Sequence, residues 1–262
     1  MLHFQGHPGL TTNEDVRSLF GGGRLAIPWP GSTRGDSWHP RALAIYAMTH
    51  SRDAATGSGN AFTVDTYVGG ATLKFSFSMT NADGTSKQTN YSSVTLPAAA
   101  TSAYADSIQQ LHLLTGSPTA DGAFAYVYQD PTNPALSFHC AGDGASNFAA
   151  AGVATRYISI HGTGTTGSTT EANANVVWPR AGTMSTFAIR YGTGSGEAYT
   201  MAIRKNNADA ATIAIPASTS ALILNTTTQV ALAAGDRICF AFTRVTTSTL
   251  LVANVVFGFE AT

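Results

Sequence analysis

Residues 199–215 read YTMAIRKNNADAATIAI, and this stretch decides the fold class. Large apolar residues stand at every second position in Tyr199–Ile203 and again in Ile213–Ile215, on either side of the polar pair Asn206-Asn207. A period of two is typical of a strand with one buried face, and asparagine tolerates the left-handed backbone of tight turns. The stretch therefore predicts a two-stranded antiparallel hairpin.

The same alternation continues on both sides of this hairpin. Thr186–Tyr191 alternates before it, Ile238–Phe242 and Val255–Phe259 alternate after it, and Leu73–Thr80 repeats the pattern in the first half. Turn signals such as Asn81-Ala82-Asp83-Gly84 separate the runs at intervals of roughly 8 to 12 residues. The pattern predicts an all-β protein built as an antiparallel β-sandwich rather than around a parallel sheet.

The composition limits the kinds of partner. Charged residues make up 11% of the 262 residues and the net charge is -1, against about 25% charged residues in typical soluble domains. A weakly charged surface is expected where neighbouring subunits cover it, with an ordinary secreted β-sandwich as the alternative. There is no Lys/Arg cluster for nucleic acid and no apolar run of about 20 residues for a membrane helix. Met1–His7 also lacks the basic and apolar regions of a signal peptide.

Composition shifts predict three parts of the chain. Residues 1–40 predict an extended N-terminal arm rich in Gly and Pro. Residues 41–154 predict a first β-sandwich domain, and residues 155–262 predict a second. The small, loop-like residues of Ala141–Ala154 place the boundary between these two domains.

Two segments leave their secondary structure open. Thr12–Phe20 has a capping residue, early acids and a following glycine, which is compatible with a short helix inside the arm. Residues 97–122 are rich in Ala, Ser and Thr, and Ala103–Leu114 is compatible with a short helix or a long loop.

Two local matches suggest an internal duplication. Gly70–Phe77 resembles Gly182–Ile189 at a spacing of 112 positions, and Arg41–Ile45 resembles Arg156–Ile160 at a spacing of 115. These matches predict two related sandwiches in tandem, with one larger sandwich as the alternative.

The arm carries the residues that we expect to bind a partner. Phe20, Trp29 and Trp38 are large aromatic residues in a segment that has no core of its own. Buried aromatic anchors dominate the energetics of many protein interfaces, so these three side chains are predicted to anchor the arm in a neighbouring subunit. A sugar-binding face lined by Trp29, Trp38, Trp178 and several tyrosines is the alternative, although such aromatics more often pack in cores or subunit contacts.

No motif in the sequence points to catalysis. Gly162–Gly167 matches G-x-G-x-x-G, but the next strand follows too soon for the helix that a dinucleotide site needs. Gly192–Gly196 lacks the lysine of a phosphate loop. Cys140 and Cys239 lie in predicted strands and are expected to be buried thiols rather than a disulfide. The histidines are scattered and the aspartates lie beside turn residues, so no enzyme activity, cofactor or metal is expected.

Three motifs of the second half carry a resemblance to a known family. Met201–Asn206 is a strand that ends in a basic-Asn turn, Ala231–Ile238 joins two strands through a Gly-Asp turn, and Val255–Glu260 closes the chain. Together they resemble the jelly-roll modules of tailed-phage virion proteins, such as head decoration proteins, head fibres and tail-fibre segments. The resemblance covers roughly residues 156–262. It implies a jelly-roll sandwich that is commonly trimeric and has no cofactor, and it assigns no site residues.

These observations give an expected function and its alternatives. We expect a capsid decoration or cement subunit located in the virion and assembled in the host cytoplasm. It would associate with copies of itself, with a trimer favoured, and with the major capsid protein or tail proteins. The alternatives are a tail-fibre or head-fibre subunit for host attachment and a carbohydrate-binding β-sandwich module. A cell-wall-degrading enzyme is least favoured, because acids are few and bound in turns.

Overall fold

A computed structural model describes residues 2–7, 14–17, 39–52, 61–69, 72–80, 88–90, 94–99, 108–115, 122–141, 146–147, 155–160, 167–192, 198–217, 221–244 and 251–262. The chain divides into two compact units, one formed by 1–99 with 103–134 and the other by 135–262 with 100–102. Within the described residues both units consist of antiparallel strands, and the 3-10 turn η3 (Glu171–Asn173) is the only helical turn. The predicted all-β class is confirmed.

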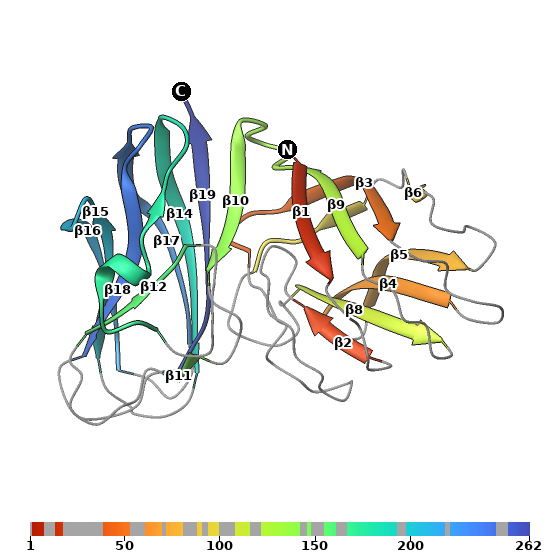
Figure 1. The fold of residues 1–262 in the computed structure, drawn as a ribbon, viewed down its shortest axis with the longest axis horizontal. Coiled ribbons are helices and arrows are strands. Elements are labelled where there is room, and N and C mark those ends of the chain that lie inside the picture. Colours follow the sequence, from red (N-terminus) through yellow and green to blue (C-terminus); the bar gives the residue numbers. More distant parts are fainter. Residues whose placement is uncertain are drawn as a thin grey trace. The chain divides into compact units, whose positions relative to one another are not determined.

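The first unit contains two antiparallel sheets (Figure 1). The strands of one sheet are β1 (Leu2–His7), β3 (Leu43–Arg52), β6 (Gln88–Asn90), β7 (Val94–Leu96) and β9 (Gly122–Gln129). The strands of the other are β2 (Glu14–Arg17), β4 (Ala61–Val68), β5 (Thr72–Thr80) and β8 (Ile108–Thr115). The orders are β1-β9-β3-β6, with β7 also paired to β3, and β2-β8-β4-β5.

The second unit also contains two antiparallel sheets (Figure 1). The strands of one sheet are β10 (Leu136–Ala141), β11 (Ser146–Asn147), β14 (Gly182–Gly192), β17 (Ala221–Leu232) and β19 (Leu251–Ala261). The strands of the other are β12 (Thr155–Ile158), β13 (Val176–Val177), β15 (Tyr199–Lys205), β16 (Ala208–Ile215) and β18 (Arg237–Arg244). The orders are β10-β19-β14-β17, with β11 on β19, and β12-β18-β15-β16, with β13 on β18.

One apolar core lies between the two sheets of the second unit. Phe187 and Phe257 from one sheet and Ile203 and Phe240 from the other are fully buried in the same cluster. The rings of Phe240 and Phe257 meet edge to face with centroids 5.6 Å apart, a favoured geometry for aromatic pairs. Because each strand turns alternate side chains inward, the period-two pattern of the sequence becomes a sandwich.

The two units share one strand order. Numbered along the chain without the short β7, β11 and β13, the described strands of each unit form one sheet in the order first-eighth-third-sixth and another in the order second-seventh-fourth-fifth. Equivalent strands begin at Leu2 and Leu136, 134 positions apart, and at Leu43 and Gly182, 139 positions apart. The units therefore repeat in their topology.

The spacing of 112 to 115 positions predicted for this repeat is wrong. The segments matched at a spacing of 112 were Gly70–Phe77 and Gly182–Ile189. The first belongs mostly to β5, the fifth strand of its unit, and the second to β14, the third strand of the other unit. Any two amphipathic strands share the period-two alternation, so a short local match does not identify equivalent strands.

The first 40 residues contribute strands to the first unit rather than only an arm. Within them, β1 pairs with β9 and β2 pairs with β8. The helix considered for Thr12–Phe20 is therefore wrong at Glu14–Arg17, which forms β2. The helix or loop considered for Ala103–Leu114 is wrong from Ile108 onward, where β8 begins. Strand partners distant in sequence override a weak local preference for helix.

The boundary between the units lies earlier than predicted. It falls between Pro134 and Ala135, because β10 pairs with β19, the last strand of the chain. Ala141 is the last residue of β10, so residues 142–154 lie between β10 and β12, in the part of the chain that belongs to the second unit. The small residues of this segment resemble a linker in composition, but composition alone does not locate a boundary between units.

The carboxylate of Asp130 fixes the last turn of the first unit. Its Oδ1 accepts hydrogen bonds from the backbone N–H of Thr132 at 2.7 Å and of Asn133 at 2.9 Å. Its Oδ2 lies 2.5 Å from Nε of Arg41, and the side chain is 1% exposed. Burial raises the pKa of Asp130, but the hydrogen bonds from Thr132 and Asn133 and the charge of Arg41 outweigh it and lower the pKa.

A bulge in β14 brings two large side chains onto the same face. The register of β14 shifts between Ser185 and Phe187 against both β17 and β19. Thr186, the extra residue, has φ of 56° and is 7% exposed. Strict alternation would place Met184 and Phe187 on opposite faces, whereas the bulge turns both into the core. Positive φ is strained for a β-branched residue, so the core packing offsets a local backbone cost.

Candidate functional site

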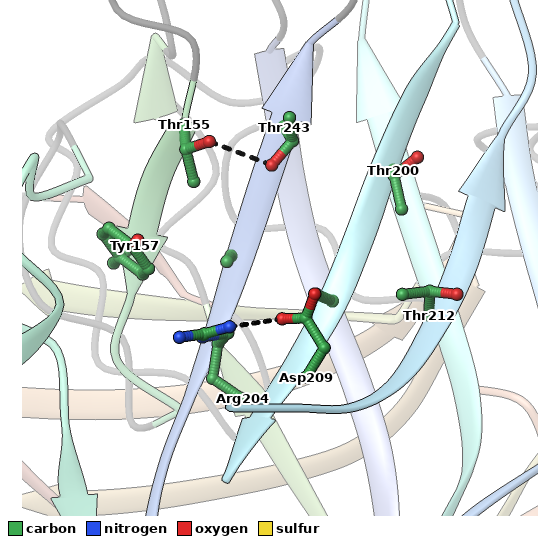
Figure 2. A pocket seen from close by; sticks show the side chains of 9 residues that line it. Thr155, Tyr157, Thr200, Arg204, Asp209, Thr212 and Thr243 are labelled. Carbon is green, nitrogen blue, oxygen red and sulfur yellow. Dashed lines mark hydrogen bonds and ion pairs between the residues drawn. The ribbon is translucent and has the colours of Figure 1, made fainter. Parts of the chain in front are cut away.

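The outer face of the β12-β18-β15-β16 sheet carries a groove of about 400 Å³ (Figure 2). Met201, Ile203, Phe240 and Phe242 point from this sheet into the core, so the residues between them point outward. Nine residues line the groove: Thr155, Tyr157, Thr200, Ala202, Arg204, Asp209, Thr212, Ala241 and Thr243. They come from four neighbouring strands, which hold them in fixed register.

Two alanines form the floor of the groove. Ala202 on β15 and Ala241 on β18 are cross-strand partners and are 6% and 3% exposed. In the same row, Tyr157 is the partner of Ala241 on one side and Thr212 is the partner of Ala202 on the other. Central strands usually carry larger β-branched or aromatic residues, so a pair of methyl groups at the centre leaves a hollow between larger neighbours.

A band of hydroxyl groups borders the groove on one side. Thr155, Thr243 and Thr200 are successive partners across β12, β18 and β15. The hydroxyls of Thr155 and Thr243 hydrogen-bond at 3.0 Å, as Figure 2 shows. A threonine hydroxyl both donates and accepts, so this band presents neutral hydrogen-bonding groups.

The opposite border is an ion cluster around Arg204. Its Nε and Nη2 donate to the two carboxylate oxygens of Glu171 at 3.0 and 2.8 Å, and its Nη1 donates to Asp209 Oδ1 at 2.5 Å. Nη2 also donates to the carbonyl of Asn207 at 2.5 Å. The hydrogen bonding of the Arg204 guanidinium to the Glu171 carboxylate is the main cause of a raised Arg204 pKa. The paired contact with Glu171 fixes the plane of the guanidinium at the edge of the groove.

The thiol of Cys239 lies in the same row as Arg204. The two residues are partners between β18 and β15, and Cys239 is free and fully buried. Burial, and after it the negative charge of Glu171, raises the pKa of this thiol to about 12. Such a thiol stays protonated and is a poor nucleophile. The sequence-based expectation of a buried thiol is confirmed for Cys239.

Two turns that carried the family resemblance are linked beside this cluster. Asn206 and Asn207, with φ of 52° and 67°, form the predicted tight turn between β15 and β16. Asn206 Nδ2 donates to Asp236 Oδ1 at 2.7 Å, and its Oδ1 accepts from the N–H of Arg237 at 2.9 Å. The N–H of Ala233 and then Asn206 lower the pKa of Asp236. The hairpin is thus fixed against the neighbouring β17–β18 turn.

The lining combines hydroxyl groups with one carboxylate and one paired guanidinium. Of its nine residues, Asp209 alone carries a carboxylate, whereas hydrolysis of a glycosidic bond by the usual route needs two acids. The lining contains no histidine or cysteine to activate a threonine hydroxyl. What it does provide is one aromatic ring, several hydroxyls and a neutralised guanidinium.

The aromatic residues singled out in the sequence have two different outcomes. Phe20, Trp29 and Trp38 lie outside the described residues. Trp178, considered for a sugar-binding face, lies in the core at 3% exposure, with its ring centroid 4.7 Å from that of Phe259. That interpretation of Trp178 is wrong, because the side chain packs between the sheets.

The described part of the chain has neither a metal-ligand cluster nor a membrane-spanning helix. No group of three or more His, Cys, Asp or Glu side chains there is placed to hold a metal ion. No helix among those residues is long and apolar enough to cross a membrane. The glycine motif of Gly162–Gly167 lies outside the described residues except for Gly167.

The groove could not be predicted from the sequence. Its signal is present in the positions between the apolar residues of four strands, where Thr, Ala and Arg alternate with core residues such as Met201 and Phe242. These positions become one surface only when the order β12-β18-β15-β16 is known.

Comparisons with known proteins do not identify a family. No family model matches the chain, and no curated protein matches it. Among solved structures, the naturally occurring empty particles (top component) of cowpea mosaic virus match with 9% identity and a TM-score of 0.26, over 98% of this chain and 89% of that one. Dimeric latent PorU from Porphyromonas gingivalis matches with 14% identity and a TM-score of 0.26, over 97% of this chain and 21% of that one.

A third match is an insecticidal delta-endotoxin of Bacillus thuringiensis, with 11% identity and a TM-score of 0.26, over 98% of this chain and 60% of that one. Likenesses of this size carry no functional argument. The class that the structure itself defines is an all-β protein of two repeated units, with a polar groove on the second.

Proposed function

We propose that the chain is a structural protein of a tailed-phage virion, a capsid decoration or cement subunit that stabilises the head by binding its neighbours. The observation that carries the proposal is the strand order shared by the two units. We infer that each unit is a jelly roll, a double sheet of eight strands that serves as a building block of viral capsids and also of lectins.

The surface chemistry supports assembly rather than catalysis. Only 11% of the residues are charged, and a protein that stays free in solution usually carries more charge to resist association. The proposed partners are other copies of the chain, with a trimer favoured, and the major capsid protein or tail proteins. Weak contacts of this kind are multiplied by the symmetry of a shell.

The proposed contact residues remain Phe20, Trp29 and Trp38. Aromatic side chains that enter pockets on a partner often supply most of the binding energy. In this proposal they anchor the N-terminal part of the chain on neighbouring capsid subunits.

A tail-fibre or head-fibre subunit is the second candidate. The groove favours it, because an open recess with polar walls suits contact with a receptor on the host surface. The two candidates differ in virion location and not in the proposed fold.

Co-sedimentation tests the proposal. The purified chain is mixed separately with heads and with tails of the phage that carries its gene, and Trp29→Ala/Trp38→Ala is compared with Tyr46→Ala. Tyr46 is an exposed aromatic residue on β3, at 40% exposure, and serves as the matched control. A deletion of residues 1–40 is unsuitable, because it removes β1 and β2 from the first unit.

The outcomes separate the candidates. A decoration protein binds heads, loses binding with the tryptophan variant and keeps it with the tyrosine variant. Binding to tails alone supports the fibre candidate. Binding to neither, together with a monomer in sedimentation equilibrium, contradicts the virion assignment.

A further inference from the structure

We propose that the groove on the outer face of the β12-β18-β15-β16 sheet binds a neutral saccharide. The structure offers this site in addition to the contacts needed for capsid assembly, and the inference holds for a head protein or a fibre alike. Its volume of about 400 Å³ falls within the range of about 300–1,000 Å³ that is typical of small-ligand sites.

The floor and one wall provide the apolar contact that a sugar ring needs. Ala202 and Ala241 form a shallow floor, and Tyr157 is the aromatic residue of the lining. The backbone of Tyr157 is held on its outer side by two hydrogen bonds with Ser168, both 2.8 Å long. An aromatic ring on a backbone held in this way can stack against the C–H face of a pyranose.

The hydrogen-bonding groups of the walls match hydroxyl groups. Thr155, Thr200 and Thr243 present hydroxyls along one border, where each can donate or accept. On the other border, hydrogen bonds to Glu171, Asp209 and Asn207 use four of the five N–H groups of Arg204. The remaining N–H on Nη1 and the second carboxylate oxygen of Asp209 form an adjacent donor and acceptor, suited to neighbouring hydroxyls of one ring.

The charge of the site selects against anions. Arg204 contributes one positive charge, whereas Glu171 and Asp209 contribute two negative charges next to it. Arg204 is the only cationic side chain that lines the groove. A phosphate, sulfate or carboxylate ligand would therefore meet a net negative charge, whereas a neutral polyol would not.

The site is organised before a ligand arrives. Figure 2 shows Thr155 and Thr243 joined at one end of the groove and Arg204 and Asp209 joined at the other. Arg204 is also fixed by Glu171, and the side chains of these two residues are 18% and 15% exposed. Pre-positioned polar groups on strands reduce the entropy lost on binding.

The test is a glycan array of neutral and acidic oligosaccharides, probed with the full chain. Titration of the best-bound glycan, followed by NMR, then gives its affinity. We expect binding to neutral glycans, a loss of about tenfold in affinity for Tyr157→Ala, and no detectable binding for Ala241→Leu, which fills the groove. Ala231→Leu adds the same bulk at an exposed alanine on β17, in the other sheet, and should bind as the unsubstituted chain does.

Three results would overturn the inference. The first is no neutral glycan bound on the array, and the second is binding that Tyr157→Ala and Ala241→Leu leave unchanged. The third is self-association that Ala241→Leu abolishes in the absence of any glycan binding, because the groove would then be an interface between copies. Co-sedimentation of Ala241→Leu with heads separates this inference from the virion proposal, since loss of the groove should leave head binding intact.

Discussion

Whether alanine in place of Gly258 stabilises or destabilises the protein should depend on the neighbouring side chain of Leu136. Gly258 lies in β19, and a Cβ added there would lie 2.8 Å from Cδ1 of Leu136, a residue of β10 that is 3% exposed. The φ of Gly258 lies outside the left-handed region, so its backbone conformation does not itself exclude alanine. We predict that Gly258→Ala destabilises the native chain and stabilises the Leu136→Ala variant.

The magnitude follows from two opposing effects. Overpacking a buried site costs about 1–3 kcal/mol, while alanine in place of glycine within a strand gains about 0.5–1 kcal/mol. Gly258→Ala alone should therefore lower the free energy of unfolding, by up to about 2.5 kcal/mol. Leu136→Ala alone should lower it by about 2–5 kcal/mol. In that background the overlap is gone and the strand gain remains, so Gly258→Ala should raise stability by about 0.5–1 kcal/mol.

Urea unfolding measures all four members of this cycle. Replacing Trp29 and Trp38 by Phe leaves Trp178 as the only tryptophan, so its fluorescence reports on the core of the second unit. Gly182→Ala is the control, because its Cβ would overlap the backbone carbonyl of Glu260, which truncating Leu136 does not move. It should destabilise both backgrounds. The reasoning is refuted if Gly258→Ala has the same sign in both.

Three further predictions concern strain and titration. Thr186→Gly should leave stability unchanged or raise it by about 1 kcal/mol, because it removes the left-handed β-branched residue; Thr183→Gly in the same strand should lower stability, and urea unfolding compares the two. Burial raises the pKa of the Cys239 thiol to about 12, so the thiol's contribution to the free energy of unfolding is complete below about pH 9 and is lost as pH rises towards 12. Cys239→Ala should therefore reduce the loss of stability at alkaline pH in unfolding experiments. A thiol that reacts readily with Ellman's reagent in the native protein would contradict this prediction. Burial lowers the His39 pKa to about 3, so the free energy of unfolding should fall by about 1.4 kcal/mol per pH unit as pH drops from about 6 towards 3. His39→Gln should reduce this slope, and carboxylates such as Asp130 account for the slope that remains. An unchanged slope would contradict the assignment to His39.

The alternation of apolar residues predicted most of the strands of the second unit. The sequence predicts the turn at Asn206-Asn207 because asparagine tolerates positive φ, and the structure has positive φ at both residues. Leu222–Leu224 and Val230–Leu232 are two apolar runs with polar residues between them in the sequence, but both belong to the single strand β17. Alternation thus located strands well where one face of each strand is buried in a core.

Strands without such a pattern could not be predicted. Glu14–Arg17 and Ile108–Thr115 have compositions that a helix also accepts, and they become strands because β8 pairs with both β2 and β4. The prediction of the boundary between the units was wrong for the same reason. The residues that decide it are the partners of β10, which lie about 120 positions further along the chain, in β19.

The two units differ on the surface where the groove lies. In the first unit, the β4–β5 pair corresponds by strand order to the β15–β16 pair of the second. Opposite the buried face of Phe75, Asp65 on β4 accepts a hydrogen bond of 2.6 Å from Ser76 on β5 and one of 3.3 Å from the Tyr67 hydroxyl. Cross-strand polar side chains there satisfy one another.

In the second unit, the pair Ala202 and Thr212 occupies the equivalent strands, and alanine leaves the space open. Strand order follows from pairing and from core positions, which both units share. The groove follows from outward positions, which can change with little effect on the core. The outward positions of the β15–β16 pair therefore define the groove independently of the strand order that the two units share. Replacing Ala202 by Asp and Thr212 by Ser, to imitate Asp65 and Ser76, should remove saccharide binding and change the free energy of unfolding by less than about 1 kcal/mol; retained binding would show that the alanine floor does not define the site.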